Sequence, residues 1–166
     1  MMNSKAIVIT GTPGVGKSTL ARYLSKQLHL HRLDLHRHYK QLAVAYNSQK
    51  QCYDLNYRKV TALVRQELKK HPEGIVIDSH IGHLLPKSLV GGCIVLTCSN
   101  LKVLAQRLRN RKYNKKKIEE NMLADIFQVC LLEAQRRKHK ILVYDSLQKK
   151  KYYLVAKEVQ AAFQRT

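Results

Sequence analysis

The chain has 166 residues, a length that suits one domain with a single core and is short for two. Because 45% of the residues are hydrophobic and only seven are glycine and three proline, the composition excludes a disordered chain, and no apolar run approaches the roughly 18 to 20 residues of a membrane span. The formal net charge is +20, which favours polyanionic partners, namely nucleotides, RNA or an acidic membrane surface.

Short apolar runs alternate with helical patterns along the chain. Strands are predicted at 5–10, 30–35, 74–78, 92–98 and 141–144. Leu20, Leu24 and Leu28 predict a helix after the first strand, and further helical patterns cover 56–70, 101–108, 118–129 and 152–163. Residues 36–53 are polar and aromatic and receive no assignment. This alternation predicts one α/β domain over residues 1–166, with a five-stranded parallel sheet flanked by helices on both faces.

The N-terminus and the cysteines bear on cellular location. "MMNSKAIVIT" runs directly into an apolar segment without a signal-peptide pattern, so we expect a cytoplasmic protein, or a nuclear one in a eukaryote, and no membrane partner. The chain has no C-x-x-C pair, which predicts buried thiols rather than disulfides or a zinc ribbon at Cys52, Cys93, Cys98 and Cys130.

A glycine-rich stretch follows the first predicted strand. "GTPGVGKS", Gly11 to Ser18, fits the pattern G-x-x-x-x-G-K-[ST] and lies between a strand and an amphipathic helix. The alternative is a chance glycine-rich turn, but this context favours a phosphate-binding loop whose backbone N–H groups and helix N-terminus surround an anion. Lys17 would then reach the β- and γ-phosphates of ATP, and Ser18 would ligate Mg²⁺.

A second polar motif, "IVIDSH", ends the predicted strand at 74–78. Asp78 stands where phosphate-loop folds hold the carboxylate that orients Mg²⁺ or its waters. An ordinary strand-ending aspartate that caps a turn is the alternative, and the phosphate loop favours the functional interpretation. His80 would orient a water molecule or the acceptor phosphate, or else only cap the following loop.

The third motif is "QRLRNRKYNKKK", residues 106–117, which is strongly basic. Arg107 and Arg111 are four apart and so share one helix face, and a guanidinium suits bidentate contact with a transferring phosphoryl group. A solvated basic face is the alternative. Phosphoryl transfer needs cations around the moving group, which favours a catalytic role for the two arginines.

Together, "GTPGVGKST", "VIDSH" and "RLRNRKYNKKKIEENMLADIFQVCLLEA" resemble the adenylate kinase isoenzyme 6 family, also called coilin-interacting nuclear ATPase proteins. The resemblance covers nearly the whole chain and implies a three-layer P-loop nucleoside-monophosphate kinase fold with a short lid at about 107–117. It also implies adenylate kinase activity with ATP, AMP and Mg²⁺, an additional ATPase activity and a connection to small-subunit ribosome assembly.

The family pattern also assigns roles to individual residues. It implies catalytic roles for Lys17, Asp78, His80, Arg107 and Arg111, Mg²⁺ ligation by Ser18 and Asp78, and ATP binding by Gly11, Pro13, Gly14, Val15, Gly16, Lys17, Ser18, Thr19 and Arg107. The acceptor segment, about 36–70, departs from the family because it has few acids and carries Lys40 near the family's arginine. Arg37, Lys40 and Arg58 are the candidate acceptor contacts.

Three functions stay open at this point. The first is transfer of the γ-phosphoryl of ATP to a nucleoside monophosphate. The second is an ATP-driven RNA or ribosome assembly factor, which the basic clusters at 107–117, 136–140 and 149–151 favour. The bases of a bound RNA would stack on nearby aromatic residues, namely Tyr113, Tyr144, Tyr152 and Tyr153. The third is a kinase of a small metabolite such as shikimate or gluconate.

Overall fold

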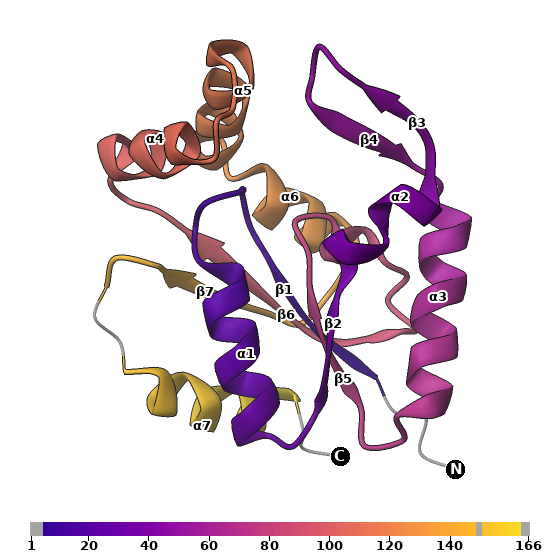
Figure 1. Cartoon of the computed structure of the whole chain (residues 1–166). Helices are drawn as coiled ribbons and strands as arrows, with labels where there is room; N and C mark the ends of the chain where they lie inside the picture. The colour runs from indigo at the N-terminus through magenta and orange to yellow at the C-terminus, as the bar shows by residue number, and fades with distance from the viewer. Residues whose placement is uncertain (1–4, 149–150, 164–166) are drawn as a thin grey trace.

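A five-stranded parallel sheet forms the centre of the molecule in the computed structural model, which describes residues 5–148 and 151–163 (Figure 1). Its strand order is β2-β5-β1-β6-β7, and every neighbouring pair is parallel. This confirms the predicted sheet, whose strands are β1 (Ala6–Thr10), β2 (His31–Asp34), β5 (Ile75–Asp78), β6 (Val90–Thr97) and β7 (Ile141–Asp145).

Helices cover both faces of the sheet because successive side chains of a buried strand point to opposite sides. Ile7 and Ile9 of β1 face one core with α1 (Lys17–Gln27), α4 (Leu101–Asn110) and α7 (Tyr152–Phe163). Val8 faces a second core with α3 (Tyr57–Lys70) and α6 (Val129–Arg136). The chain therefore has the three layers expected of a P-loop kinase.

Two segments differ from the sequence-based expectation. Residues 36–53 lie in η1 (Leu35–His38), α2 (Tyr39–Leu42) and an antiparallel hairpin of β3 (Ala43–Asn47) and β4 (Cys52–Leu55). The helical pattern over 118–129 is wrong as a single helix: α5 (Lys115–Ile126) ends before α6 because Gln128 has a φ of 50°. Such a left-handed residue cannot continue a right-handed helix, so the chain changes direction there.

Several segments gather beyond the carboxyl ends of the strands. The β3–β4 hairpin and the pair α4 and α5 stand on the same side of the sheet as the loop that follows β1 (Figure 1). η2 (Gly82–Leu84) follows β5. In open parallel sheets this edge is where ligands bind, and the topology therefore places three of the motifs found in the sequence at one location.

The state of the cysteines and the length of the helices can be compared with the expectations of buried thiols and of no membrane span. All the cysteines are free thiols; Cys93 and Cys98 are buried, while Cys52 and Cys130 are half-buried. Within 5–148 and 151–163, no helix combines the length and the apolar character needed to cross a membrane.

Candidate active site

The phosphate loop connects the buried strand β1 to helix α1. Its backbone turns at Gly11, with a φ of 138°, and at Gly16, which caps α1 with a φ of 99°. A Cβ added at Gly11 would lie 2.3 Å from the carbonyl oxygen of Leu96, so only glycine fits beside β6. The N-terminus of α1 is therefore held at the end of the sheet, where its free N–H groups favour an anion.

Lys17 is the first residue of α1, and its ammonium group lies over the loop. Nζ donates hydrogen bonds of 2.8 Å to the carbonyl oxygens of Gly11 and Thr12. Burial lowers the pKa of Lys17 to about 8; the charge of Arg111 acts in the same direction and the carboxylate of Asp78 opposes it. The side chain is thus still mainly cationic at neutral pH, and a phosphate beside it would favour the charged form.

A cleft of about 820 Å³ opens in front of this loop. This size falls in the range of small-molecule sites. Of the residues predicted to bind ATP, Pro13, Gly14, Gly16, Lys17, Ser18 and Thr19 line it, together with Asp78, His80 and Arg111. Gly11 and Val15 are buried beneath the loop, where Val15 packs in the core with α1.

Asp78 ends β5 at the floor of the cleft and is only 4% exposed. Its Oδ2 accepts a 2.6 Å bond from Nη2 of Arg32, which also lies 3.2 Å from Asp34 Oδ2. Asp34 ends the neighbouring strand β2, in register with Asp78. Arg32 thus offsets the charge of two carboxylates that would otherwise repel, and it orients Asp78.

His80 follows Asp78 and also lines the cleft. Its Nδ1 is hydrogen-bonded to the hydroxyl of Tyr39 at 3.2 Å, and that hydroxyl also lies 3.2 Å from Ser79 Oγ. Burial, reinforced by the charge of Lys17, lowers the pKa of His80 to about 3. The imidazole is therefore neutral at neutral pH, with Tyr39 fixing its ring.

The two arginines of the predicted lid occupy different environments. Arg107, on α4, donates from Nη1 to the carbonyl oxygen of Gly14 at 3.1 Å. Arg111 lies just beyond the end of α4, as its C-cap, and faces the cleft. Arg107 thus contacts the phosphate loop itself, and Arg111 lines the cleft in front of that loop.

A carboxylate on α5 also connects the lid to the phosphate loop. Asp125 accepts a 2.6 Å bond from the hydroxyl of Thr12, and its other oxygen accepts from the backbone N–H of Cys98 at 3.3 Å. The phosphate loop is thus held from the side of α4 and from the side of α5.

The hairpin and the lid meet over the cleft. Asn114 donates from its backbone to Gln51 Oε1 at 3.0 Å and from its side chain to the carbonyl oxygen of Gln49 at 3.2 Å, and Lys117 also donates to the carbonyl oxygen of Gln51. Lys117 Nζ further lies 4.1 Å from the ring centroid of Tyr113. These contacts close the cleft on the side opposite the phosphate loop.

Aromatic side chains of the hairpin line this closed side. Tyr46 and Tyr53 are cross-strand partners with ring centroids 4.9 Å apart, and both contribute to the cleft. Tyr39 and Tyr113 contribute further aromatic surface. The cleft is thus cationic at the phosphate loop and aromatic at the hairpin.

The predicted acceptor cations lie elsewhere. Arg37 is exposed and lies 3.5 Å from Asp34, and Lys40 is exposed on α2. Arg58 lines a separate pocket of about 320 Å³ with Arg65 and Arg137. None of the three predicted cations is among the residues that line the large cleft.

Other cations besides Lys17 and Arg111 line the cleft. Arg22 of α1, Lys50 of the hairpin and Lys117 of α5 all contribute to the cleft. Apart from their charge, nothing in the sequence pattern pointed to Arg22 and Lys50. Lys117 lies in the basic run at 107–117, and the tyrosines of 39–53 were visible only as an aromatic segment.

Oxygen donors at the loop fit a magnesium ion. The hydroxyl of Ser18 and the carboxylate of Asp78 line the same cleft beside Lys17, and hard oxygen ligands are those that Mg²⁺ prefers. The residues present therefore suit the metal that accompanies ATP.

Comparisons with known proteins agree with this geometry. Residues 7–128 match a family model described as an AAA domain. The adenylate kinase isoenzyme 6 homolog of Dictyostelium discoideum is 35% identical over 135 residues, which cover 80% of this chain and 75% of the relative. The homolog of the same name from Schizosaccharomyces pombe is 34% identical, covering 78% of this chain and 73% of that protein. A shikimate kinase from Bacteroides thetaiotaomicron shares the fold, with a TM-score of 0.60, 12% identity and coverage of 97% of this chain and 99% of its own.

Proposed function

The chain belongs to the adenylate kinase isoenzyme 6 family and is a kinase with the P-loop fold, and from this premise we propose that it transfers the γ-phosphoryl group of ATP to AMP. One observation carries the proposal: a single cleft is lined by the phosphate loop on one side and by Tyr46 and Tyr53 on the other. A cationic loop suits the triphosphate, and a pair of aromatic rings suits a nucleobase, which stacks on such surfaces.

The acceptor site is the part that the comparisons leave open. A shikimate or gluconate acceptor has no aromatic ring, so it would gain little from the tyrosines of the hairpin. A nucleoside monophosphate would place its base near Tyr46 and Tyr53 and its phosphate near Arg22 and Lys50, which line the same cleft. Arg37 and Lys40, in the acceptor segment at about 36–70, would then attract the acceptor as it approaches rather than bind it inside the cleft.

Transfer itself requires positioning and charge stabilisation. An acceptor phosphate oxygen forms a new bond to the γ-phosphorus while the bond to the β–γ bridging oxygen breaks, and ADP leaves with that electron pair. Lys17 and Arg111 would stabilise the charge that spreads over the moving group, and Arg107 would hold the lid at about 107–117 against Gly14. Neutral His80 would orient the acceptor or a water molecule through its free ring nitrogen.

Magnesium would be held beside these groups. Ser18 and Asp78 would bind the Mg²⁺ that accompanies ATP, directly or through water, and its charge offsets that of the β- and γ-phosphates. Arg32 would keep Asp78 oriented through the 2.6 Å ion pair to its Oδ2.

Product stoichiometry tests the proposal. A kinase makes two ADP for each ATP consumed when AMP is present, whereas an ATPase makes one whether AMP is present or not. We expect the ratio of two with AMP and far slower turnover with shikimate or gluconate. A ratio of one at saturating AMP would refute the kinase proposal and leave hydrolysis as the activity. Tyr46→Ala should raise the KM for AMP more than the KM for ATP.

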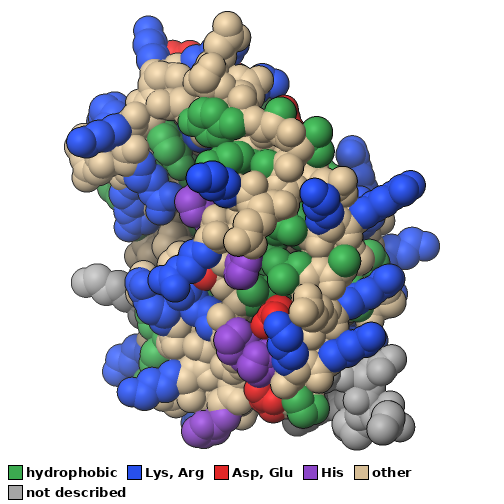
Figure 2. All heavy atoms as spheres, turned by 45° about the vertical axis from the view of Figure 1, so that its right-hand side comes forward, with side chains coloured by type: hydrophobic (Ala, Val, Ile, Leu, Met, Phe, Trp, Pro, Cys, Tyr) green, Lys and Arg blue, Asp and Glu red, His purple; other side chains and the backbone are tan. Residues whose placement is uncertain are grey.

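A second candidate function, RNA binding in ribosome assembly, rests on charge outside the cleft. Lys and Arg side chains are spread over the face in Figure 2, with few acids among them. Arg58, Arg65 and Arg137 line one pocket away from the phosphate loop, and Arg136 and Lys138 beside it are exposed. Of the basic clusters predicted to bind RNA, residues 149 and 150 lie outside the described part of the chain.

A salt titration with a labelled ribosomal RNA fragment tests this candidate. The slope of log K against log salt should be about 0.7 per phosphate contact on single strands. Arg65→Ala and Arg137→Ala should each lower that slope, while Lys69→Ala, an exposed residue of α3 outside the pocket, serves as the control. Absence of binding at low salt would exclude the RNA function and leave the kinase proposal unaffected.

A further inference from the structure

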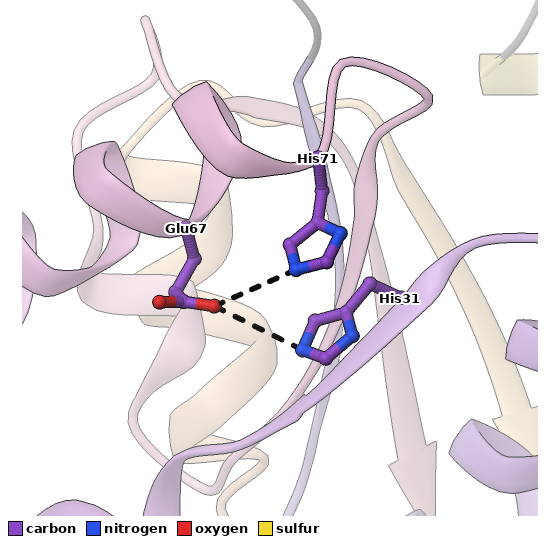
Figure 3. A group of neighbouring side chains, drawn as sticks. All are labelled: His31, Glu67 and His71. Carbon is purple, nitrogen blue, oxygen red and sulfur yellow. Dashed lines mark ion pairs between the residues drawn. The ribbon is translucent and has the colours of Figure 1, made fainter.

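Two histidines and a glutamate meet at the edge of the molecule, away from the cleft (Figure 3). His31 begins the edge strand β2, Glu67 lies in the last turn of α3, and His71 caps the end of that helix. One ligand atom of each lies within 4.8 Å of the others. None of the three lines either the active cleft or the pocket around Arg58.

The fold holds these side chains in a defined arrangement. The imidazole rings of His31 and His71 are stacked, with centroids 3.9 Å apart and planes inclined by 2°. Both Nε2 atoms face the same carboxylate oxygen, Glu67 Oε2, at 3.9 and 3.8 Å. The backbone N–H of His71 donates to the carbonyl oxygen of Glu67 at 3.0 Å, which fixes the spacing of these two ligands.

Neighbouring charged side chains contact the outer atoms of Glu67 and His71. Lys70 donates to Glu67 Oε1 at 2.8 Å, which leaves Oε2 as the carboxylate oxygen that faces the two imidazole rings. Glu73 Oε1 lies 3.0 Å from Nδ1 of His71. A proton on Nδ1 would satisfy Glu73 and leave the lone pair of Nε2 directed at Glu67, as in metal sites where a carboxylate orients a ligating histidine.

The separations fit a bridging cation better than a direct hydrogen bond. At 3.8 and 3.9 Å the Nε2 atoms are too far from Glu67 Oε2 for a hydrogen bond. Around a tetrahedral zinc ion with bonds of about 2.0–2.1 Å, ligand atoms stand about 3.3 Å apart. The two rings, which are parallel in this structure, would tilt toward each other to direct both Nε2 lone pairs at one ion.

We propose that His31, Glu67 and His71 form a binding site for a transition-metal ion of the Zn²⁺ type, with water completing the coordination. Two imidazole nitrogens and one carboxylate oxygen favour such an ion over Mg²⁺, which prefers oxygen alone. The side chain of His31 is 39% exposed and that of His71 26%, so an ion can enter from solvent. The bound ion cross-links β2, which leads to Asp34 in the cleft, to the end of α3.

Calorimetric titration of the full chain with Zn²⁺ in excess Mg²⁺ tests the site, because Mg²⁺ occupies oxygen-rich sites. We expect one Zn²⁺ per chain, and binding at least tenfold weaker in His31→Ala, His71→Ala and Glu67→Gln. Glu73→Gln should weaken binding by about 10- to 100-fold, the usual effect of losing a partner of a ligating histidine. His29→Asn is the control: His29 is exposed, has a φ of 53° that asparagine tolerates, and should leave Zn²⁺ binding unchanged.

Thermal unfolding and Co²⁺ substitution give independent readouts. Zn²⁺ should raise the melting temperature of the wild type and of His29→Asn but not of His71→Ala, since an ion that binds only the folded chain stabilises it. Co²⁺ bound at the same site should show visible absorption without a thiolate charge-transfer band. Binding that persists unchanged in all three ligand variants, or that carries a thiolate band from the free cysteines, would overturn the proposal.

Discussion

Gly11 offers the sharpest test of how the phosphate loop is built. In Gly11→Ala the new Cβ would lie 2.3 Å from the backbone carbonyl oxygen of Leu96, at a residue whose φ is 138°. Backbone strain at such a φ costs about 1–3 kcal/mol. Forced displacement of close-packed neighbours costs about 1–3 kcal/mol more. The sum, about 2–6 kcal/mol, is a large part of the 5–15 kcal/mol by which ordinary domains are stable.

Gly16 provides the matched control, since it also has a positive φ, of 99°, but a Cβ added there meets nothing within 4 Å. Gly16→Ala should therefore lose only the strain, about 1–3 kcal/mol. The assay is urea unfolding followed by circular dichroism. With an m-value of about 2 kcal/mol per molar, the midpoint should fall by about 1–3 M in Gly11→Ala and by clearly less in Gly16→Ala. Equal midpoints for the two variants would show that the contact with Leu96 does not matter.

The remaining predictions concern catalysis and the lid. Lys17→Ala should lower ATP turnover by several orders of magnitude without unfolding the chain, and a variant that keeps more than about a tenth of the activity, a loss of only about 1.4 kcal/mol, would refute the role of Lys17. In the wild type, kcat/KM for ATP should fall as the pH rises through about 8, because Lys17 of the free protein then loses its proton. The value of kcat should fall only at higher pH, because a bound phosphate favours the protonated lysine. A flat profile of kcat/KM from pH 7 to 9 would contradict this. Arg111→Ala should lower kcat more than it raises the KM for ATP, and the reverse result would return Arg111 to a solvated surface role. Asn114→Ala should speed proteolytic cleavage of the hairpin tip around Gln51, since it removes the 3.2 Å side-chain bond to the hairpin, and unchanged cleavage would mean that this bond does not hold the lid closed.

Much of the fold could be predicted from short stretches of the sequence. The inner strands β1, β5 and β6 are apolar runs because both of their faces are largely buried, and the helices that cover the sheet carry apolar residues at helical spacing. The edge strands β2 and β7 are only partly buried, and β2 carries polar residues. The phosphate loop is likewise a local pattern, with Gly11 and Gly16 at the backbone positions of positive φ and Lys17 at the first position of the helix. These features were predictable because they depend on residues that are close in sequence.

The break between α5 and α6 and the β3–β4 hairpin were not predictable in this way. Gln128 is not a glycine, and nothing in its neighbours signals a φ of 50°. The hairpin shows no alternation of apolar and polar residues, and its apolar strand β3 is largely exposed. Tyr46 and Tyr53 line the cleft, and Tyr53 also packs against the core. Its structure is fixed by pairing across the strands and by contacts with the lid.

The contacts that distinguish the cleft and the histidine cluster join residues far apart in the chain. Arg32 and Asp78 are 46 residues apart, and Asn114 and Gln51 are 63 apart. His31 and His71 stack only because β2 lies beside β5 and the end of α3 returns to the same edge. Charge and residue type can nominate such groups from the sequence. Which of them meet depends on the path of the backbone between them, because an ion pair or a stacked pair of rings forms only at a few ångströms.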